Sequence, residues 1–122
     1  MQALIFFGHG ARDPRWKEPF DKLAKLWKNN FPKIPVSLAF LELMDPSLLQ
    51  AISSLNHSNL KEIIIVPVFF GQGSHLRNDF PFLVETCKQS FPHIHFRVAP
   101  PVGEDLDVLQ AIINGANRYL CG

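Results

Sequence analysis

Two histidines in this chain stand at matching places, each after a run of apolar residues that ends in glycine. His9 follows the run 3–7 and Gly8, and His75 follows the run 63–70 and two further glycines. Imidazole binds divalent metal ions and exchanges protons near neutral pH, so a histidine at such a place can carry out chemistry. Because the arrangement occurs twice, we interpret both histidines as functional rather than as ordinary surface residues.

The apolar runs that precede these histidines are typical of buried β-strands. The run over 63–70 has no polar side chain, and a strand that is apolar on both faces is typical of a covered parallel sheet. Further strands are predicted at 3–7, 36–41 and 93–99. The last of these alternates polar and apolar residues, so we expect it at the edge of the sheet.

A helix is predicted after each strand. The helices are expected to begin near 14 or only at Pro19, at 48, near 78–79 with Pro81 in the first turn, and at 106. The last of them, over 106–116, has apolar side chains available for burial and is expected to close the domain.

Four alternating strands and helices predict an α/β fold: a small doubly wound four-stranded parallel sheet of the flavodoxin-like kind, with strand order 2-1-3-4. Such sheets bind ligands at the carboxyl ends of their strands. Glu42 follows the second strand. The predicted order therefore brings His9, Glu42 and His75 to one edge of the sheet from adjacent strands.

Two imidazoles and a carboxylate form an incomplete coordination set for a divalent first-row metal, with positions left for water or a substrate nitrogen. The set contains no thiolate, so it suits cobalt, iron or nickel held for exchange better than a permanent structural zinc. A simpler interpretation is that Glu42 only stabilises the start of the next helix. His93 and His95 would also share one face of the last strand, but at the end remote from this edge.

Length and composition limit the classes of function. The 122 residues, 47% of them hydrophobic, suffice for one compact domain over 1–122. The formal net charge of +1 gives no broad basic surface, so nucleic acid and anionic membranes are not expected as partners. The apolar runs are shorter than the roughly 18 residues of a membrane span, no signal peptide is evident, and Cys87 and Cys121 form no metal motif. We expect a cytoplasmic protein.

Three segments carry a resemblance to a known family: Phe7–Pro14, Phe40–Glu42 and Val66–Pro81. They resemble the short CbiX-type class II tetrapyrrole chelatases, which are sirohydrochlorin chelatases. The resemblance extends over essentially the whole chain in its order of elements, and the two glycine–histidine segments are its most specific part. Ala11 stands where many relatives have a serine, so a hydroxyl contact at that point is not expected.

The resemblance implies a lyase that inserts cobalt, or else iron or nickel, into a sirohydrochlorin-type macrocycle, as in cobalamin or siroheme biosynthesis. It implies His9 and His75 as the metal-site histidines and Glu42 as the neighbouring carboxylate. The metal is then a substrate, and no permanently bound cofactor is expected. The short form also implies a homodimer, because the two-domain relatives are about twice as long.

The substrate of such an enzyme carries peripheral carboxylates, which need cationic or backbone N–H partners. Arg12 and Arg77 are the expected cationic partners. Gly73 and Ser74, just before His75, are the further expected substrate-binding residues, and the helix start near Asp13 could also donate N–H groups.

Two other functions stay open. A noncatalytic carrier of a metal or a tetrapyrrole could use the same fold and the same histidines. A histidine phosphatase is suggested by the histidine and arginine of the segment Gly8–Arg12, but such enzymes carry arginine immediately before the histidine, where this chain has glycine.

Overall fold

The computed structural model describes residues 1–120 and contains a four-stranded sheet. The strands are β1 (Gln2–Gly8), β2 (Val36–Phe40), β3 (Glu62–Pro67) and β4 (His95–Val98). The helices are α1 (Glu18–Asn30), α2 (Leu48–Leu55), α3 (Ser74–Ser90) and α4 (Leu106–Asn117), with 3-10 turns η1 (Pro14–Lys17) and η2 (Val102–Glu104). Neighbouring strands are parallel and lie in the order β2-β1-β3-β4, so the predicted α/β fold is confirmed.

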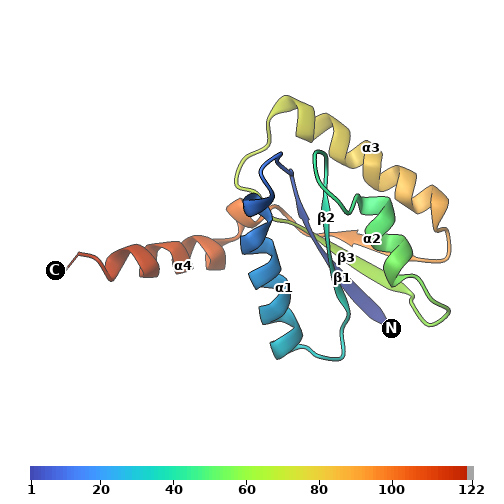
Figure 1. Ribbon diagram of the computed structural model, residues 1–122, viewed down its shortest axis with the longest axis horizontal. Helices are drawn as coiled ribbons and strands as arrows, with labels where there is room; N and C mark the ends of the chain where they lie inside the picture. Colours follow the sequence, from blue (N-terminus) through green and yellow to red (C-terminus); the bar gives the residue numbers. More distant parts are fainter. Residues whose placement is uncertain (121–122) are drawn as a thin grey trace.

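The helices cover the two faces of the sheet unequally (Figure 1). α1 lies on one face, and α2 and α3 lie on the other. Alternate residues of β1 serve the two faces, because successive side chains of a strand point in opposite directions. Ile5 and Phe7 belong to the larger apolar core beneath α2 and α3, whereas Leu4 and Phe6 belong to a smaller cluster with Phe20 of α1.

The chain enters α1 through the 3-10 turn η1. The Asp13 carboxylate caps this turn by accepting a hydrogen bond from the backbone N–H of Arg15. α1 itself begins at Glu18, with Pro19 in its first turn, where a missing N–H costs no helical hydrogen bond. The later of the two predicted starts is therefore the observed one.

The third helix begins earlier than predicted. α3 starts at Ser74 with Gly73 as its extended N-cap residue, and Pro81 lies inside the helix. The expected start near 78–79 was wrong because it treated the proline as a first-turn residue. A helix can instead accommodate an interior proline at the loss of a backbone hydrogen bond. His75 consequently lies in the first turn of α3.

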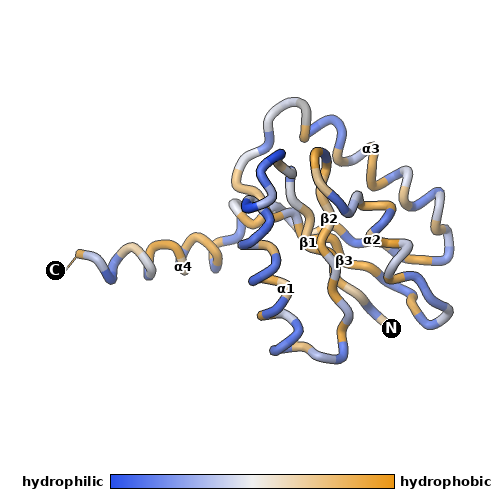
Figure 2. The backbone as a smooth tube through the Cα atoms, viewed as in Figure 1, coloured by the Kyte–Doolittle hydropathy of each residue, from blue (hydrophilic) through white to orange (hydrophobic). Residues whose placement is uncertain are grey.

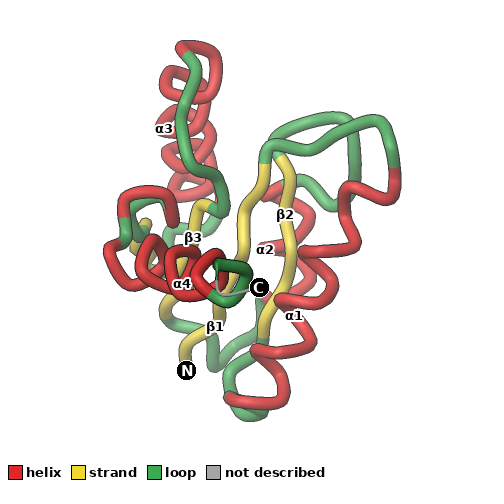
Figure 3. Tube along the Cα trace, turned by 90° about the vertical axis from the view of Figure 1, so that its left-hand side faces the viewer, coloured by secondary structure: helices red, strands yellow, loops and turns green. Residues whose placement is uncertain are grey.

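The last helix does not close the fold as predicted. α4 projects away from the sheet on the side of α1, as the ribbon and the turned view both show (Figures 1 and 3), and none of its residues is buried. The helix is apolar over much of its length (Figure 2). The expectation that it packs on the body of its own chain was therefore wrong.

Strand β3 differs from its prediction in the same way. Ile63 and Ile65 are buried beneath α2 and α3, but Ile64 and Val66, which point to the α1 face, are only half-buried. The prediction of burial on both faces holds for one face only, because within residues 1–120 no helix lies over β3 beside α1.

The sheet ends at β4, which pairs with β3 and is the predicted edge strand. It is shorter than expected, since His93 lies in the turn before it. Across residues 1–120, no helix is both long and apolar enough to cross a bilayer.

Candidate functional site

The carboxyl ends of β1 and β2 bring His9 and Glu42 side by side. Gly8 is in register with Phe40, and the backbone pairing continues past the strand ends. The N–H of Leu41 donates to the carbonyl oxygen of Gly8 at 2.9 Å, and that of Glu42 donates to the carbonyl oxygen of His9 at 3.2 Å. These bonds hold the two loops together at the edge that sequence analysis identified.

The side chains of His9 and Glu42 meet in partly open surroundings. His9 Nε2 lies 3.5 Å from Glu42 Oε1, and the side chains are 43% and 42% exposed. His9 Nδ1 lies 3.2 Å from the carbonyl oxygen of Gly10. Because a carbonyl accepts only, this contact assigns the ring proton to Nδ1 in the neutral imidazole. The Nε2 lone pair then faces the carboxylate.

Two electron-pair donors that face each other are stabilised by a cation between them. Ligand bonds of about 2.1 Å at a tetrahedral angle place two donor atoms about 3.4 Å apart. The observed 3.5 Å between Nε2 and Oε1 matches that separation. Partners such as the Gly10 carbonyl commonly fix the ring orientation of metal-binding histidines. His9 and Glu42 therefore form an open pair suited to a divalent metal.

Gly10 is the structural reason why this pair can form. Its φ is +96°, a conformation that disfavours other residues, and a Cβ at this position would lie 1.8 Å from the carbonyl oxygen of Glu42. Only glycine lets the two loops approach so closely. Sequence analysis noted Gly10 within a motif but missed this role; its place directly after a candidate ligand was the available signal.

The third predicted ligand lies on a neighbouring element at the same edge. The N–H of Val68 donates to the carbonyl oxygen of Phe7 at 2.7 Å, so the chain leaving β3 stays beside the end of β1. His75 is the second residue of α3, and its side chain lies outside the described part of the structure. Among the side chains that are described, no three His, Cys, Asp or Glu residues gather to hold a metal. The three-residue site stays a prediction.

Glu42 does not cap the following helix. The N-cap of α2 is Ser47, whose hydroxyl accepts a hydrogen bond from the N–H of Gln50 at 3.2 Å while the Gln50 side chain bonds back to the N–H of Ser47. This capping box satisfies the start of α2 without an acidic residue. The simpler interpretation of Glu42 is therefore wrong.

The expected substrate-binding residues lie in the loop after β1 and at the start of α3. Arg12 is exposed in the loop after β1, while Gly73, Ser74 and Arg77 are exposed at the start of α3. The N–H of Arg77 donates to the carbonyl oxygen of Gly73 at 3.0 Å, which forms the first turn of that helix. The structure contains no ligand contact that would test these residues.

The helix start near Asp13 is not available for a substrate carboxylate. The Asp13 carboxylate accepts bonds from the backbone N–H of Arg15 at 2.9 Å and from its guanidinium at 2.7 Å. The guanidinium hydrogen bonds, and then the backbone bond, lower the pKa of Asp13 below its ordinary value. An anion here would meet a negative charge, so this expectation was wrong.

The second histidine pair of the sequence is divided between different partners. His93 Nε2 lies 3.0 Å from Asn56 Oδ1, whereas His95 Nε2 lies 3.8 Å from Glu62 Oε2. Arg97 Nε lies 3.3 Å from the same Glu62 oxygen. Because the Arg97 guanidinium already pairs with the Glu62 carboxylate, this end of the sheet is poorly suited to a metal.

Comparisons of the sequence with family models and with known proteins point to the same family. Residues 3–119 match the family model CbiX. A sirohydrochlorin cobaltochelatase of Saccharolobus islandicus is 28% identical over 97% of this chain and 95% of its own length. One from Methanocaldococcus jannaschii is 40% identical over 69% of this chain and 59% of its length, and one from Priestia megaterium is 25% identical over 98% of this chain but only 40% of its length. The chain thus spans less than two thirds of some of these relatives.

Among solved structures, too, the chain matches one protein over its full length and another over half of its length. A CbiX protein from Marinobacter aquaeolei VT8 is 29% identical with a TM-score of 0.83, and the match covers 98% of both chains. The sirohydrochlorin chelatase SirB from Bacillus subtilis subspecies spizizenii, solved with cobalt, is 21% identical with a TM-score of 0.79 and shares the fold. This chain corresponds to 50% of the length of SirB. With a family model that matches nearly its whole length and a fold shared from end to end with a CbiX protein, this chain belongs to the CbiX family.

Proposed function

We propose that this chain is a sirohydrochlorin metal chelatase, a lyase that inserts a divalent metal ion into sirohydrochlorin or a related tetrapyrrole. The main observation in support is the partly exposed pair of His9 and Glu42, whose Nε2 and Oε1 atoms lie 3.5 Å apart. The pair lies at the carboxyl ends of the strands in a chain of the CbiX family. The names of the relatives support Co²⁺ as the first candidate metal, and Fe²⁺ and Ni²⁺ are the alternatives.

The metal is a substrate in this proposal. His9 and His75 bind the ion as neutral imidazoles, and Glu42 lies beside it. Insertion removes two protons from pyrrolic nitrogens and forms bonds from the four ring nitrogens to the metal, so two positive charges leave as two positive charges arrive. Glu42 or a histidine released from the metal accepts a proton. Their partial exposure lets that proton pass on to water.

The macrocycle is held by its carboxylates. Arg12, in the loop after β1, and Arg77, near the start of α3, supply charge-assisted hydrogen bonds. Gly73 and Ser74 offer N–H groups at the start of α3, where the helix dipole favours an anion. A single edge of this sheet encloses little of so large a ligand, so we propose that the enzyme is a homodimer.

The test is a multiple-turnover assay with sirohydrochlorin and Co²⁺, Fe²⁺ or Ni²⁺, with iron kept anaerobic, read by absorption against the nonenzymatic rate. We expect turnover with at least one metal. His9→Ala, His75→Ala and Glu42→Gln should each abolish most of it. His57→Ala is the matched control, since His57 is an exposed turn residue between α2 and β3.

Two results would contradict the proposal. Stoichiometric binding of metal or tetrapyrrole without turnover would indicate a carrier. Loss of turnover in His57→Ala as large as in His9→Ala would remove the assignment of the site. Hydrolysis of a phosphate ester without added metal would favour the histidine phosphatase, although a Cβ at Gly8, as an arginine there requires, would lie 2.5 Å from the Phe20 ring.

A further inference from the structure

Leu43, the residue after Glu42, combines two features that are unusual for a leucine. Its φ is +69°, and in the part of the chain that the structure describes no other residue except glycine has a positive φ. This left-handed conformation brings Cβ close to the following carbonyl oxygen, so glycine and asparagine adopt it more readily. The Leu43 side chain is also 54% exposed. The conformation thus costs free energy that burial of the side chain does little to offset.

The two apolar cores do not explain why a leucine stands at position 43. Two other apolar residues of the same loop pack inward: Leu41 on the larger core, and Met44 on the smaller cluster that contains Phe20. Leu43 belongs to neither cluster among the residues that the structure describes. Core packing therefore calls for Leu41 and Met44, but it gives no reason for an apolar side chain at Leu43.

The backbone that leads into Leu43 is fixed against the loop after β1. The N–H of Glu42 donates to the carbonyl oxygen of His9 at 3.2 Å. A Cβ on Gly10 would lie 1.8 Å from the carbonyl oxygen of Glu42, which belongs to the peptide group that joins Glu42 to Leu43. The Cα atoms of these two residues are about 3.8 Å apart, as across any trans peptide. Leu43 is therefore held beside the pair of His9 and Glu42.

The substrate of the proposed function has a surface that an exposed leucine fits. A tetrapyrrole macrocycle is a broad ring system with apolar faces, and its carboxylates lie on the rim. A metal ion reaches the four ring nitrogens through one of these faces, so that face must lie toward the pair of His9 and Glu42. Arg12 and Arg77 are suited to the carboxylates of the rim, not to the apolar face. An apolar side chain beside the pair is suited to it.

We propose that Leu43 is a substrate-binding residue that contacts one apolar face of the macrocycle beside the metal pair. Backbone strain persists in proteins mainly where function requires it, and the strained residue here is exposed and adjacent to Glu42. Contact with the ring face removes apolar surface of both the leucine and the substrate from water. This inference rests on the proposed function and deepens it, because it assigns recognition of the ring face in addition to that of the carboxylates.

The test titrates the full chain with sirohydrochlorin in the absence of metal, followed by absorption, and compares two substitutions of Leu43. Leu43→Asn removes the apolar contact but suits the positive φ. Its Kd should rise about 10-fold, while its Tm should rise by about 2 °C. Leu43→Met keeps both the apolar contact and the strain, so its Kd should stay within about 2-fold of that of the unmodified chain. A purely structural role would instead lower stability and affinity together.

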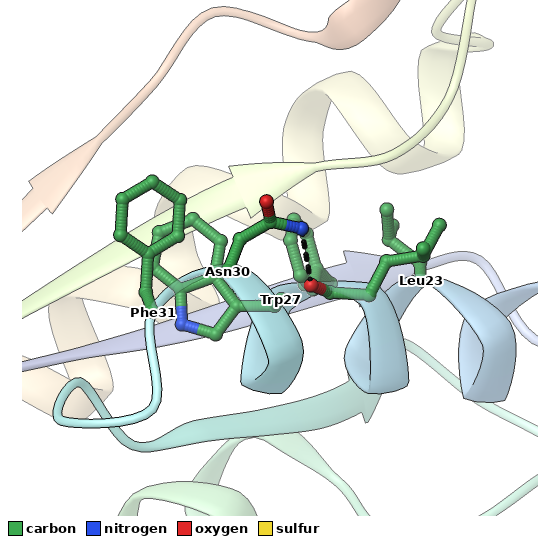
Figure 4. Close-up of a pocket in the computed structure, with 6 residues that line it drawn as sticks. Leu23, Trp27, Asn30 and Phe31 are labelled. Atoms are coloured by element: carbon green, nitrogen blue, oxygen red, sulfur yellow. Dashed lines mark hydrogen bonds between the residues drawn. The ribbon is translucent and has the colours of Figure 1, made fainter.

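Phe31→Ala is the control for loss of an exposed apolar side chain elsewhere. Phe31 is 48% exposed where α1 ends and the chain turns toward the start of β2, and with Trp27 it lines an open pocket of about 170 Å³ (Figure 4). Its Kd for sirohydrochlorin should be unchanged. Isothermal titration with Co²⁺ alone should give the same metal affinity for Leu43→Asn and for the unmodified chain, because His9 and Glu42 are both retained.

Four results would overturn this role and leave the proposed function standing. Leu43→Asn could bind sirohydrochlorin as tightly as the unmodified chain, or Leu43→Met could lose as much affinity as Leu43→Asn. Phe31→Ala could weaken binding as much as Leu43→Asn. Finally, Leu43→Asn could lose stability and Co²⁺ affinity together with substrate affinity. If instead the unmodified chain did not bind sirohydrochlorin at all, the proposed function itself would fail, and the role of Leu43 with it.

Discussion

The loop after β1, which contains His9, and the loop after β3, which leads to His75 in the first turn of α3, differ in how tightly they are packed. In the loop after β1, a Cβ on Gly10 would lie 1.8 Å from the carbonyl oxygen of Glu42, so backbone touches backbone. In the loop after β3, a Cβ on Gly71 or Gly73 would meet nothing within 4 Å. The same pattern of glycine and histidine therefore occurs in two kinds of surroundings. The loop after β1 is held against the backbone of Glu42, whereas the loop after β3 has open space at both of its glycines.

The largest expected effect is the difference in stability between adding a methyl group at Gly10, in the loop after β1, and adding one at Gly71, in the loop after β3. Gly10→Ala should destabilise the protein by about 3 kcal/mol or more, since it combines an unfavourable φ with a clash against backbone. Gly71→Ala, the matched control, should stay within about 0.5 kcal/mol of the unmodified protein. Urea unfolding measures both. Equal losses in the two variants would remove the distinction between the loops.

Metal binding by the pair of His9 and Glu42 should respond to pH. Imidazole binds metal only when neutral, so the affinity for Co²⁺ should fall as the solution is acidified. In His9→Ala the affinity at neutral pH should be about 100-fold lower and its dependence on pH shallower. Isothermal titration at several pH values measures this. An unchanged pH dependence in His9→Ala and in His75→Ala would exclude both histidines as ligands.

The two arginines test whether the loop after β1 and the start of α3 bind the same substrate. Arg12→Ala and Arg77→Ala should each raise KM for the tetrapyrrole about 10-fold with little change in kcat, because each removes a charge-assisted bond made before insertion. Steady-state kinetics with Lys28→Ala as control measures this. If only one variant raised KM, carboxylate binding would be confined to the element that carries that arginine.

The smallest expected effect concerns α3, the helix after the β3 loop, and whether it stays packed around its buried thiol. Cys87 of α3 is fully buried, and burial raises the pKa of its thiol to about 11. In a Cys121→Ser chain, the native protein should react with a thiol reagent at pH 8 far more slowly than the unfolded protein. Rapid reaction would show that α3 opens together with the loop.

The same thiol predicts how stability changes at alkaline pH. The unfolded state ionises Cys87 near its ordinary pKa, while the folded state keeps it neutral up to about 11. Raising the pH from about 9 to about 11 therefore favours the unfolded state. Cys87→Ala should show a weaker decline in stability over this range.

Much of the fold follows from local patterns in the sequence. The apolar runs are long enough to identify four strands, and alternation with helices restricts a parallel sheet to few strand orders. That order in turn brings the ends of β1 and β2 together, which is why His9 and Glu42 could be paired from the sequence. The alternation of β4 likewise indicated an edge strand.

Other features depend on contacts between distant residues. The start of α3 was misplaced because an interior proline reads locally as a first-turn proline, although Gly73 begins the helix earlier. The need for glycine at position 10 arises from the carbonyl of Glu42, which is remote in sequence. The close approach of Gly103, before α4, to the backbone of Phe70 likewise joins residues that are remote in sequence. An apolar side determines that a helix must be buried somewhere, but only the tertiary structure decides against which surface.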